Sequence, residues 1–315
     1  MKAWLRLAIA VVVLAVVAGV LFWPHKPAPP AASALPLIKV DNAQVQQVTI
    51  TQPGQPTIQV ERTGSSTWKM TQPYAYAADG AAVTSLLDTL GNITSTQKIG
   101  PADNLATFGL DHPSTIELTR SSGGPLDFQF GATTPMGQSV YLRIGSGPVE
   151  MADGTVRDSV LKNAFALQDK TILYFPEDQV TAIDVTQGGK TLHLDKVKDA
   201  WPAVQKDNVQ ALLDALSGAQ MSAMIDPAGK ITPAMHLTPP AVTLKLTWSG
   251  GTSAATPAGS GQIEVGGKQD DSNDYARTSV SPAIFSISTY LVDDMTKLLA
   301  PPPPPAPTSK PSATK

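Results

Sequence analysis

Serine–lysine pairs are the first residues in this sequence whose spacing could support chemistry. Ser159 and Lys162 are three positions apart, so a helix would place the hydroxyl one turn from the amine. Serine acyl-enzymes use this spacing for lysine-assisted deprotonation of the nucleophile. The same pattern also occurs at Ser95 with Lys98 and at Ser312 with Lys315. The chain has neither the Lys-Thr-Gly nor the Ser-x-Asn companion motif, so the pattern discriminates poorly and we predict no catalytic residue.

An acidic cluster late in the chain offers oxygen ligands of the kind that Ca²⁺ prefers. It consists of Asp270, Asp271, Asn273 and Asp274. The EF-hand pattern fails here, because the sixth loop position is not glycine and Pro282 occupies the place of the bidentate glutamate. The cluster therefore predicts a solvated hairpin turn and no calcium site.

The histidines are also too scattered to suggest a metal centre. They are His25, His112, His193 and His236. None shows the H-x-x-x-H or His/Glu spacing that zinc sites use. We predict surface or half-buried roles for them, with no metal and no cofactor.

Two pairs of residues recur at related positions and invite a binding interpretation. Trp68 and Trp201 could stack on sugars or peptide, although a repeated tryptophan more often anchors a core. Arg143 and Arg277 each follow a tyrosine by two residues, and we favour structural ion pairs over ligand contacts for both. Asn92 opens a formal glycosylation sequon.

Composition excludes several classes of protein. The 315 residues carry 23 Lys and Arg against 26 Asp and Glu, so no basic surplus exists to bind nucleic acid. The absence of cysteine excludes disulfide scaffolds, thiolate metal sites and cysteine nucleophiles. A hydrophobic content of 42% with 16% charged residues is typical of a globular chain.

The N-terminal segment predicts a membrane anchor. Residues 7–23 carry no charge, and Lys2 and Arg6 precede them. At 1.5 Å per residue a helix of this length spans about 25 Å, slightly less than the hydrocarbon core of a bilayer. The positive-inside rule keeps the N-terminus cytoplasmic and places the rest of the chain outside the cytoplasm. The alternative is a signal peptide cleaved at the A-x-A site of residues 32–34, which lies far from the apolar run.

An internal repeat determines the predicted fold. Residues 83–91 (VTSLLDTLG) resemble residues 209–217 (VQALLDALS), 126 positions later. Both place Val and Leu at helical spacing on one face, and Asp79 and Asp207 precede them as candidate N-caps or first-turn acids.

Further landmarks recur in the same order and are mostly strand-like. They pair residues 110–113 with 237–240, 127–131 with 262–266, and 141–143 with 275–277. Alternating segments predict hairpins, and each copy closes with a predicted helix, at residues 156–167 and 288–299. Residues 249–261 predict a long, flexible hairpin loop. The expected fold is α+β: an N-terminal transmembrane helix followed by two divergent copies of a mostly antiparallel sheet with helices.

The corresponding domain organisation has five parts. We expect a transmembrane anchor (1–24), a Pro/Ala-rich linker (25–44), copy 1 (45–175), copy 2 (176–300) and a disordered Pro-rich tail (301–315).

These landmarks resemble the bacterial domain-of-unknown-function family 4340. The motifs that carry the resemblance are residues 68–73, Asp79, Leu86, Leu87 and Leu90, residues 108–113 (FGLDHP), residues 131–137 (GATTPMG) and Tyr141. Copy 2 departs from the pattern, with Thr238 and Pro239 in the turn. The resemblance implies a membrane-anchored, internally repeated protein, and some relatives are encoded near ABC-type transporter subunits. It implies no catalytic residues.

The expected function follows from these points. We predict a non-enzymatic, single-pass protein of the cytoplasmic membrane whose extracytoplasmic body contacts another envelope protein, with an ABC-transporter assembly as one partner class. The first alternative is a module that binds a small ligand or glycan between the two copies. The second is a hydrolase of envelope polymers, which the lack of an acid/base constellation disfavours.

Overall fold

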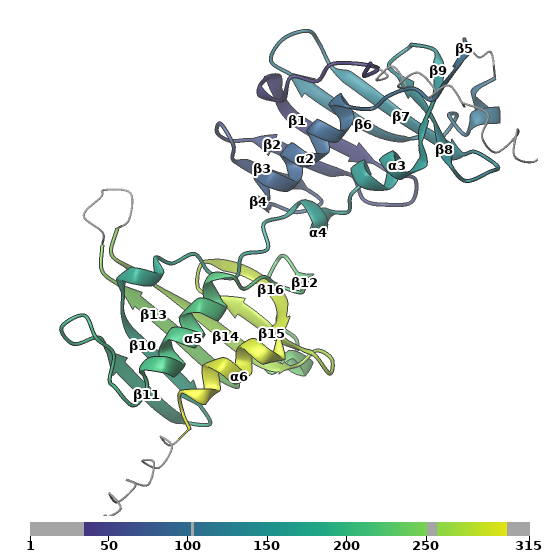
Figure 1. Cartoon of the computed structure of the whole chain (residues 1–315). Coiled ribbons are helices and arrows are strands. Elements are labelled where there is room, and N and C mark those ends of the chain that lie inside the picture. The colour runs from purple at the N-terminus through teal and green to yellow at the C-terminus, as the bar shows by residue number, and fades with distance from the viewer. Residues whose placement is uncertain (1–34, 102–103, 251–256, 301–315) are drawn as a thin grey trace, which may run out of the picture.

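A computed structural model describes residues 35–101, 104–250 and 257–300 and contains two antiparallel sheets (Figure 1). We call the nine-stranded sheet with its helices unit 1 and the seven-stranded sheet with its helices unit 2. The prediction of an α+β chain dominated by antiparallel sheet is confirmed. The predicted anchor at residues 7–23, the predicted tail at residues 301–315, and His25, Ser312 and Lys315 lie outside the described residues.

The strands of unit 1 occur in the following spatial order. They are β4 (Tyr76–Ala78), β3 (Trp68–Gln72), β2 (Ile58–Arg62), β1 (Val45–Thr51), β6 (Ser114–Arg120), β7 (Leu126–Thr133), β8 (Ser139–Ile144), β9 (Val149–Asp153) and β5 (Gln97–Gly100). Those of unit 2 are β11 (Lys190–Asp195), β10 (Val180–Gln187), β13 (Val242–Trp248), β14 (Gly259–Lys268), β15 (Asn273–Thr278), β16 (Ser281–Ser288) and β12 (Ala223–Asp226). Without β3 and β4, the order in unit 1 is the same as that in unit 2, strand for strand.

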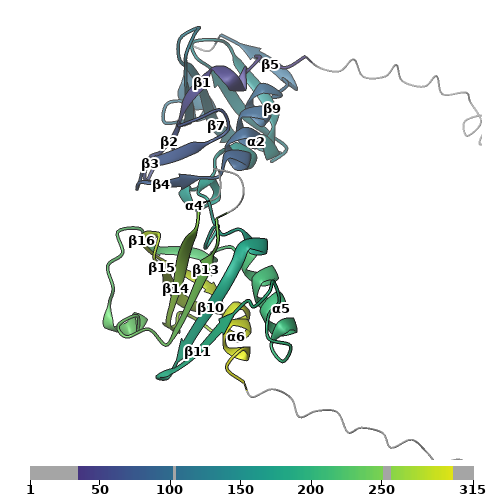
Figure 2. The same cartoon turned by 90° about the vertical axis from the view of Figure 1, so that its left-hand side faces the viewer.

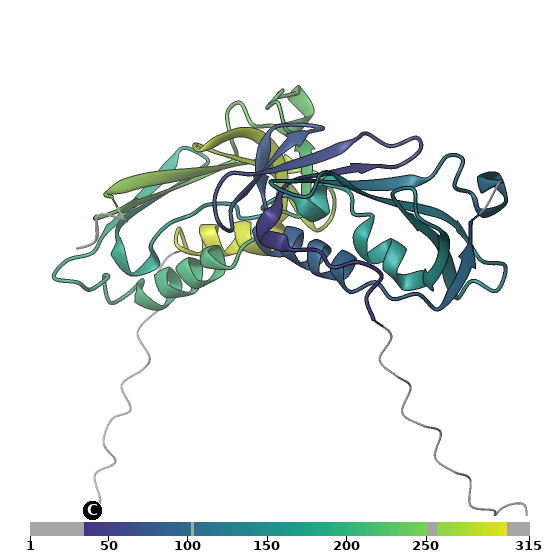
Figure 3. The same cartoon turned by 90° about the horizontal axis from the view of Figure 1, so that it is seen from above.

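The helices are few and lie on one face of each sheet. They are α2 (Gly80–Gly91), α3 (Gly154–Val160), α4 (Ala164–Leu167), α5 (Lys206–Ser217) and α6 (Thr289–Lys297), with 3-10 turns η1 (Asn42–Gln44), η2 (Leu105–Phe108), η3 (Glu177–Gln179) and η4 (Pro233–Met235). Viewed from above, the helices of both units lie on the same side of the molecule (Figure 3). No helix within the three described ranges is long and apolar enough to cross a membrane.

The apolar stripes of the two main helices form the centre of each core, as their spacing predicts. Helix α2 buries Val83, Leu86, Leu87 and Leu90, and α5 buries Val209, Leu212, Leu213 and Leu216. Such a stripe covers the inner face of a sheet because residues at i, i+3, i+4 and i+7 share one side of a helix. Asp79 is the N-cap of α2, and its side chain accepts hydrogen bonds from the N–H groups of Ala81 and Ala82. Asp207 is instead an acidic residue in the first turn of α5, whose N-cap is Gln205.

The cross-strand registers of the two units also correspond. Ile50 faces Ile116 across β1 and β6, and Val185 faces Leu244 across β10 and β13. Both first strands carry a bulge at the same place, before Gln47 and before Ala182. The repeat predicted from the sequence therefore has a structural counterpart at the level of single residues.

The closing helix of unit 1 differs from the prediction. A single helix over residues 156–167 is wrong: α3 ends at Val160, and α4 begins after Asn163. The side chain of Asn163 accepts a hydrogen bond from the N–H of Ala166, so it starts a new helix. In unit 2 the closing helix α6 is continuous and packs along α5 (Figure 1).

A short connection joins the units through hydrogen bonds to both. Gln168 forms a β-bridge with Ala78 at the edge of unit 1, and Thr171 forms one with Gln220 of unit 2. The fully buried Gln168 side chain accepts a bond from the Tyr74 hydroxyl (2.6 Å) and contacts the sulfur of Met221 (3.0 Å). Figure 2 shows the units stacked end to end about this connection.

The chain at the start of the described residues belongs with unit 1. Leu37, Ile38 and Val40 pack against its core, although the sequence predicts a linker over residues 25–44. Pro36 forms a β-bridge with Thr94, just beyond the end of α2. Both ends of the described chain emerge on the helical side of the molecule (Figure 3).

Candidate functional site

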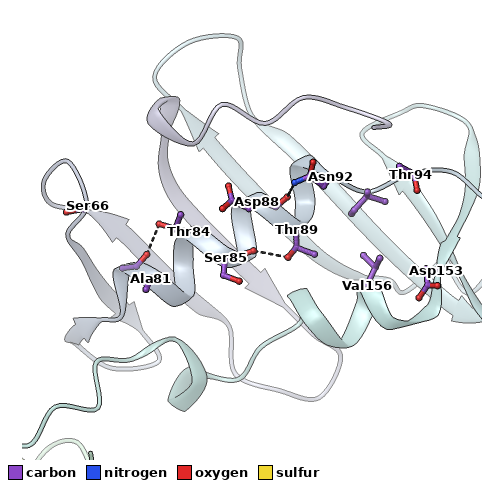
Figure 4. Close-up of a pocket in the computed structure, with 12 residues that line it drawn as sticks. Ser66, Ala81, Thr84, Ser85, Asp88, Thr89, Asn92, Thr94, Asp153 and Val156 are labelled. Carbon is purple, nitrogen blue, oxygen red and sulfur yellow. Dashed lines mark hydrogen bonds between the residues drawn. The ribbon is translucent and has the colours of Figure 1, made fainter. Parts of the chain in front are cut away.

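A groove with a volume of about 960 Å³ lies on the outer side of α2 in unit 1. Helix α2 contributes one wall, and α3 with the end of β9 contributes the other (Figure 4). The exposed or half-exposed residues that α2 presents to the groove are Ala81, Thr84, Ser85, Asp88, Thr89 and Asn92. On the α3 side the groove is lined by Asp153 and Val156, at the start of that helix.

The surface of this groove is less polar than its residue types suggest. The hydroxyl of Thr84 donates to the carbonyl of Gly80 (2.7 Å), and that of Thr89 donates to the carbonyl of Ser85 (2.8 Å), as Figure 4 shows. Hydroxyls that bond back to the helix leave their methyl groups facing outward. The α2 wall therefore presents methyl groups and small side chains.

Among the described residues, the charged side chains that line the groove are two carboxylates. Asp88 accepts a hydrogen bond from the side chain of Asn42 (2.6 Å). Asp153 caps α3: hydrogen bonds from the hydroxyl and the N–H of Thr155 lower the pKa of its carboxyl. Acidic side chains without a basic one among the described lining residues make the groove more favourable for a cationic group than for an anionic one.

Helix α5 of unit 2 presents a different outer surface. Its sequence contains Lys206, Asp207 and Asp214, whereas Asp88 is the only charged residue of α2. Gln210 is tied to Glu177 (3.0 Å) and to Asp214 (2.8 Å), so the outer side of α5 is polar and internally hydrogen-bonded. The two helices are alike on their buried sides and unlike on their exposed sides.

A second hollow, of about 530 Å³, lies at the junction of the two units. Its walls include Trp68 and Tyr76 from unit 1, Tyr174 from the connection, and Val280 and Ser281 from the β15–β16 turn of unit 2. Tyr174 is 70% exposed and its hydroxyl contacts Asp169. Burial raises the pKa of Tyr76, and burial followed by the Asp169 contact raises that of Tyr174, so both remain neutral donors.

The two serine–lysine pairs that lie within the described residues form no hydrogen bond between serine and lysine. Ser159 donates to the carbonyl of Thr155 (2.8 Å), and the Lys162 amine lies against the carbonyl of Asp158. Ser95 donates to Glu150 (2.6 Å) and not to Lys98. Each serine hydroxyl is thus directed to an oxygen acceptor.

The acidic cluster forms the hairpin turn that its sequence predicts. Asp270 accepts bonds from the N–H groups of Ser272 and Asn273, and Asp274 is buried and accepts from Thr289. Within the described ranges no group of three or more His, Asp or Glu side chains is placed to hold a metal ion. The side chain of Asp271 forms no hydrogen bond or ion pair with another described residue.

The histidines and tryptophans have local roles. His112 is exposed, His236 ends η4 in a left-handed conformation (φ 48°), and both lie in Pro-bounded turns. His193 lies between two carboxylates, 2.5 Å from Asp184 and 2.9 Å from Asp195.

The two tryptophans are core residues: Trp68 is 4% exposed and Trp201 is 9% exposed. The guanidinium of Arg62 lies over the ring of Trp68, and the amine of Lys196 lies over the ring of Trp201.

The prediction of paired arginines holds for only one of the two. Arg277 forms an ion pair with Glu264, with a distance of 2.6 Å between Nε and the carboxylate. Arg143 has no carboxylate partner among the described residues, and its Nε donates to the carbonyl of Gly147 (3.0 Å). The expected ion pair at Arg143 is therefore wrong, because Gln129 stands where unit 2 has Glu264.

Sequence reasoning missed the groove on α2 and the Asp184–His193–Asp195 cluster, and it allowed for a site between the two copies without identifying the residues that line the junction hollow. The His193 contacts depend on the β10–β11 register, which places Asp184 opposite His193. The one usable signal for the groove was the absence of Lys, Arg and Glu from the α2 segment.

Comparisons with known proteins give one match. A family model described as "Domain of unknown function (DUF4340)" matches residues 68–234, more than half of the chain. It extends from β3 of unit 1 to η4 of unit 2. No curated protein and no solved structure matches the chain.

Proposed function

The chain belongs to the DUF4340 family, and from that premise we propose that it is a non-enzymatic, membrane-anchored envelope protein that docks a partner protein on the outer side of α2. In this proposal residues 7–23 cross the membrane and both units lie outside the cytoplasm. Units 1 and 2 are divergent copies of one ancestral unit, and unit 1 is the copy that makes the contact.

The observation that supports docking most directly is the uncovered flank of α2. Small side chains and outward methyl groups allow another helix to approach closely. Asp88 and Asp153 add negative charge, and no Lys or Arg of the described ranges lines the groove, which favours a partner segment that carries a basic side chain. The partner is thus a helix with small residues and at least one Lys or Arg.

The position of the groove relative to the anchor favours a partner at the membrane. Pro36 is bridged to Thr94, which itself lines the groove. The dozen residues between the apolar run and this point reach at most about 40 Å when extended. The groove would then stay close to the bilayer, within reach of the extracytoplasmic part of a membrane protein. An ABC-transporter subunit is one partner class of this kind.

A pair of matched substitutions tests the docking proposal. Ser85→Arg fills the groove, and Ala211→Arg places the same side chain at the equivalent exposed position of α5. Arg is a good helix former, so both variants should retain the stability of the wild type within about 0.5 kcal/mol. Full-length protein would be purified in detergent from its native membrane, and co-purifying membrane proteins would be quantified.

We expect a stoichiometric membrane protein with the wild type and with Ala211→Arg, and its loss with Ser85→Arg. The same set of proteins in all three samples contradicts docking at α2. Turnover of an envelope polymer by the purified chain, abolished in Ser159→Ala, would replace the proposal with the hydrolase alternative.

The junction hollow supports a second candidate function, the binding of a glycan between the units. It is partly aromatic and partly polar, the combination expected of a small-ligand site. The exposed ring of Tyr174 provides a stacking face, and Ser281 and Asp169 provide hydrogen-bonding groups at its rim. Envelope oligosaccharides should protect Tyr174 from chemical modification if this function is real, and an unchanged modification rate would exclude it.

A further inference from the structure

The same arginine has different surroundings in the two units. Arg143 on β8 is the register partner of Gln129 on β7, and Arg277 on β15 is the register partner of Glu264 on β14. The tyrosine two residues earlier is also shared, Tyr141 in unit 1 and Tyr275 in unit 2. Unit 2 neutralises its arginine with a carboxylate, and unit 1 places a neutral amide at that position.

The nearby carboxylates of unit 1 do not replace the missing partner. Gln129 donates to Asp127 on its own strand (2.5 Å). Glu150, on the neighbouring strand β9, accepts from Ser95. Of the guanidinium nitrogens of Arg143, only Nε has a hydrogen-bond partner among the described residues, the carbonyl of Gly147. The N–H groups of Nη1 and Nη2 can therefore donate hydrogen bonds to a ligand.

The half-buried Arg143 side chain lines a pocket of about 440 Å³ beside the β8–β9 turn. Lys98 of the edge strand β5 is its second cation and also lacks an ion pair in the part of the chain that the structure describes. Among the described residues that line the pocket there is no Asp or Glu, and Pro101, Leu105, Pro148 and Val149 provide apolar walls. The pocket is on a different part of unit 1 from the α2 groove, since the two share no lining residue.

From this arrangement we propose that unit 1 binds the oxyanion group of a small organic acid at Arg143 and Lys98. Two free guanidinium N–H groups suit the two oxygens of a carboxylate or phosphate. The apolar walls accept the hydrocarbon body of the ligand, and the pocket has the size of a site for a small molecule. This inference is independent of the docking function proposed for α2.

Binding can be measured on the full-length protein with two separate probes. Hexanoate supplies a carboxylate on an apolar body, and saturation-transfer NMR reports its binding. Inorganic phosphate supplies the oxyanion alone, and its ³¹P line width reports binding in a parallel experiment. Hexanamide is the neutral control for hexanoate.

The decisive variant is Gln129→Glu, which gives Arg143 the partner that Arg277 already has. We expect it and Arg143→Gln to weaken binding of the responding anion by about tenfold or more, because a charge-assisted hydrogen-bond pair is lost. Arg277→Gln should leave binding unchanged, and Lys98→Gln should weaken it to a smaller extent. Thermal unfolding of each variant checks that unit 1 remains folded.

The two probes distinguish the source of the oxyanion. A hexanoate response that Gln129→Glu removes supports a carboxylic acid, and a phosphate response alone that it removes supports a phosphate group. Equal binding by the wild type, Gln129→Glu and Arg143→Gln overturns the proposal, as does a hexanamide response equal to that of hexanoate.

Discussion

Units 1 and 2 share a strand order and a register, and differ in what they expose. In both, the main helix buries one Val and three Leu, and the tryptophan lies under a cation. On the surface, a helix face of small residues with one acidic side chain in unit 1 corresponds to a face with several charged side chains in unit 2. Arg143, which has no ion pair among the described residues, corresponds to the paired Arg277. Packing fixes the buried positions of both units, and the exposed positions have diverged into different surfaces.

A glycine in each unit illustrates how closely the packing is shared. A Cβ on Gly131 would lie 2.2 Å from the carbonyl oxygen of Phe108, and one on Gly266 would lie 2.1 Å from that of Met235. Both would also approach the following leucine, Leu110 or Leu237. The turn before β6 therefore contacts β7 in the same way as the turn before β13 contacts β14.

The largest expected effect comes from the two core leucines. Leu87 and Leu213 are 1% and 2% exposed, so Leu87→Ala and Leu213→Ala should each lower the free energy of unfolding by about 2–5 kcal/mol. Hydrogen exchange followed by mass spectrometry reads the two units separately. A large loss in one unit with little loss in the other would break the equivalence of the cores.

The two glycines should give the next largest effect. Gly131→Ala and Gly266→Ala each force a methyl group against a carbonyl oxygen, and overpacking of this kind costs about 1–3 kcal/mol. Similar losses in chemical denaturation are expected for both. Gly218→Ala is the control, because nothing lies within 4 Å of its added Cβ. Tolerance of either core substitution would contradict the shared turn geometry.

Helix capping should distinguish the units. Asp79 accepts two backbone hydrogen bonds at the start of α2, so Asp79→Ala should lower stability by about 1 kcal/mol. Asp207 makes no capping bond, so Asp207→Ala should cost less than about half of that. An equal decrease in the free energy of unfolding for both variants, measured by urea denaturation, would show that the two helix N-termini are equivalent.

The smallest effect concerns pH and is confined to unit 2. Hydrogen bonds to Asp184 and then Asp195 raise the pKa of His193 above its usual value of 6.5. A raised folded-state pKa means that the protonated ring favours the folded state at acidic pH, and this contribution is lost as the pH rises through the folded-state pKa. NMR titration should show a lower midpoint for the His193 ring in Asp184→Asn, and an unchanged midpoint would exclude the pairing. Unit 1 has Gln59 at the corresponding place, bonded to Glu61 (3.2 Å), and has no ring to titrate there.

Much of the fold could be predicted because burial imposes periodicity. The stripes of α2 and α5 and the alternation in β6, β7, β13 and β14 are visible in the sequence. The edge strands β5 and β12 were missed, since neither contains a fully buried residue and so neither shows alternation. Strand β16 was missed because five consecutive buried residues hide its period.

The candidate sites were harder to predict because they depend on contacts between distant strands and helices. The free state of Arg143 follows from a residue on another strand, Gln129. The α2 groove combines residues of α2 with Ser66, Asp153 and Val156, which are far from α2 along the chain. Neither relation has a local sequence signature.

The central claim is that unit 1 makes the contact through α2, and site-specific photocrosslinking tests it most directly. A photoreactive amino acid would replace Ser85 in one sample and Ala211, at the equivalent position of α5, in the other, each in the full-length protein in its native membrane. We predict one discrete adduct with a membrane protein from position 85, reduced by Asp88→Lys, and none from position 211. No adduct at position 85, or the same adduct from both positions, would contradict the claim.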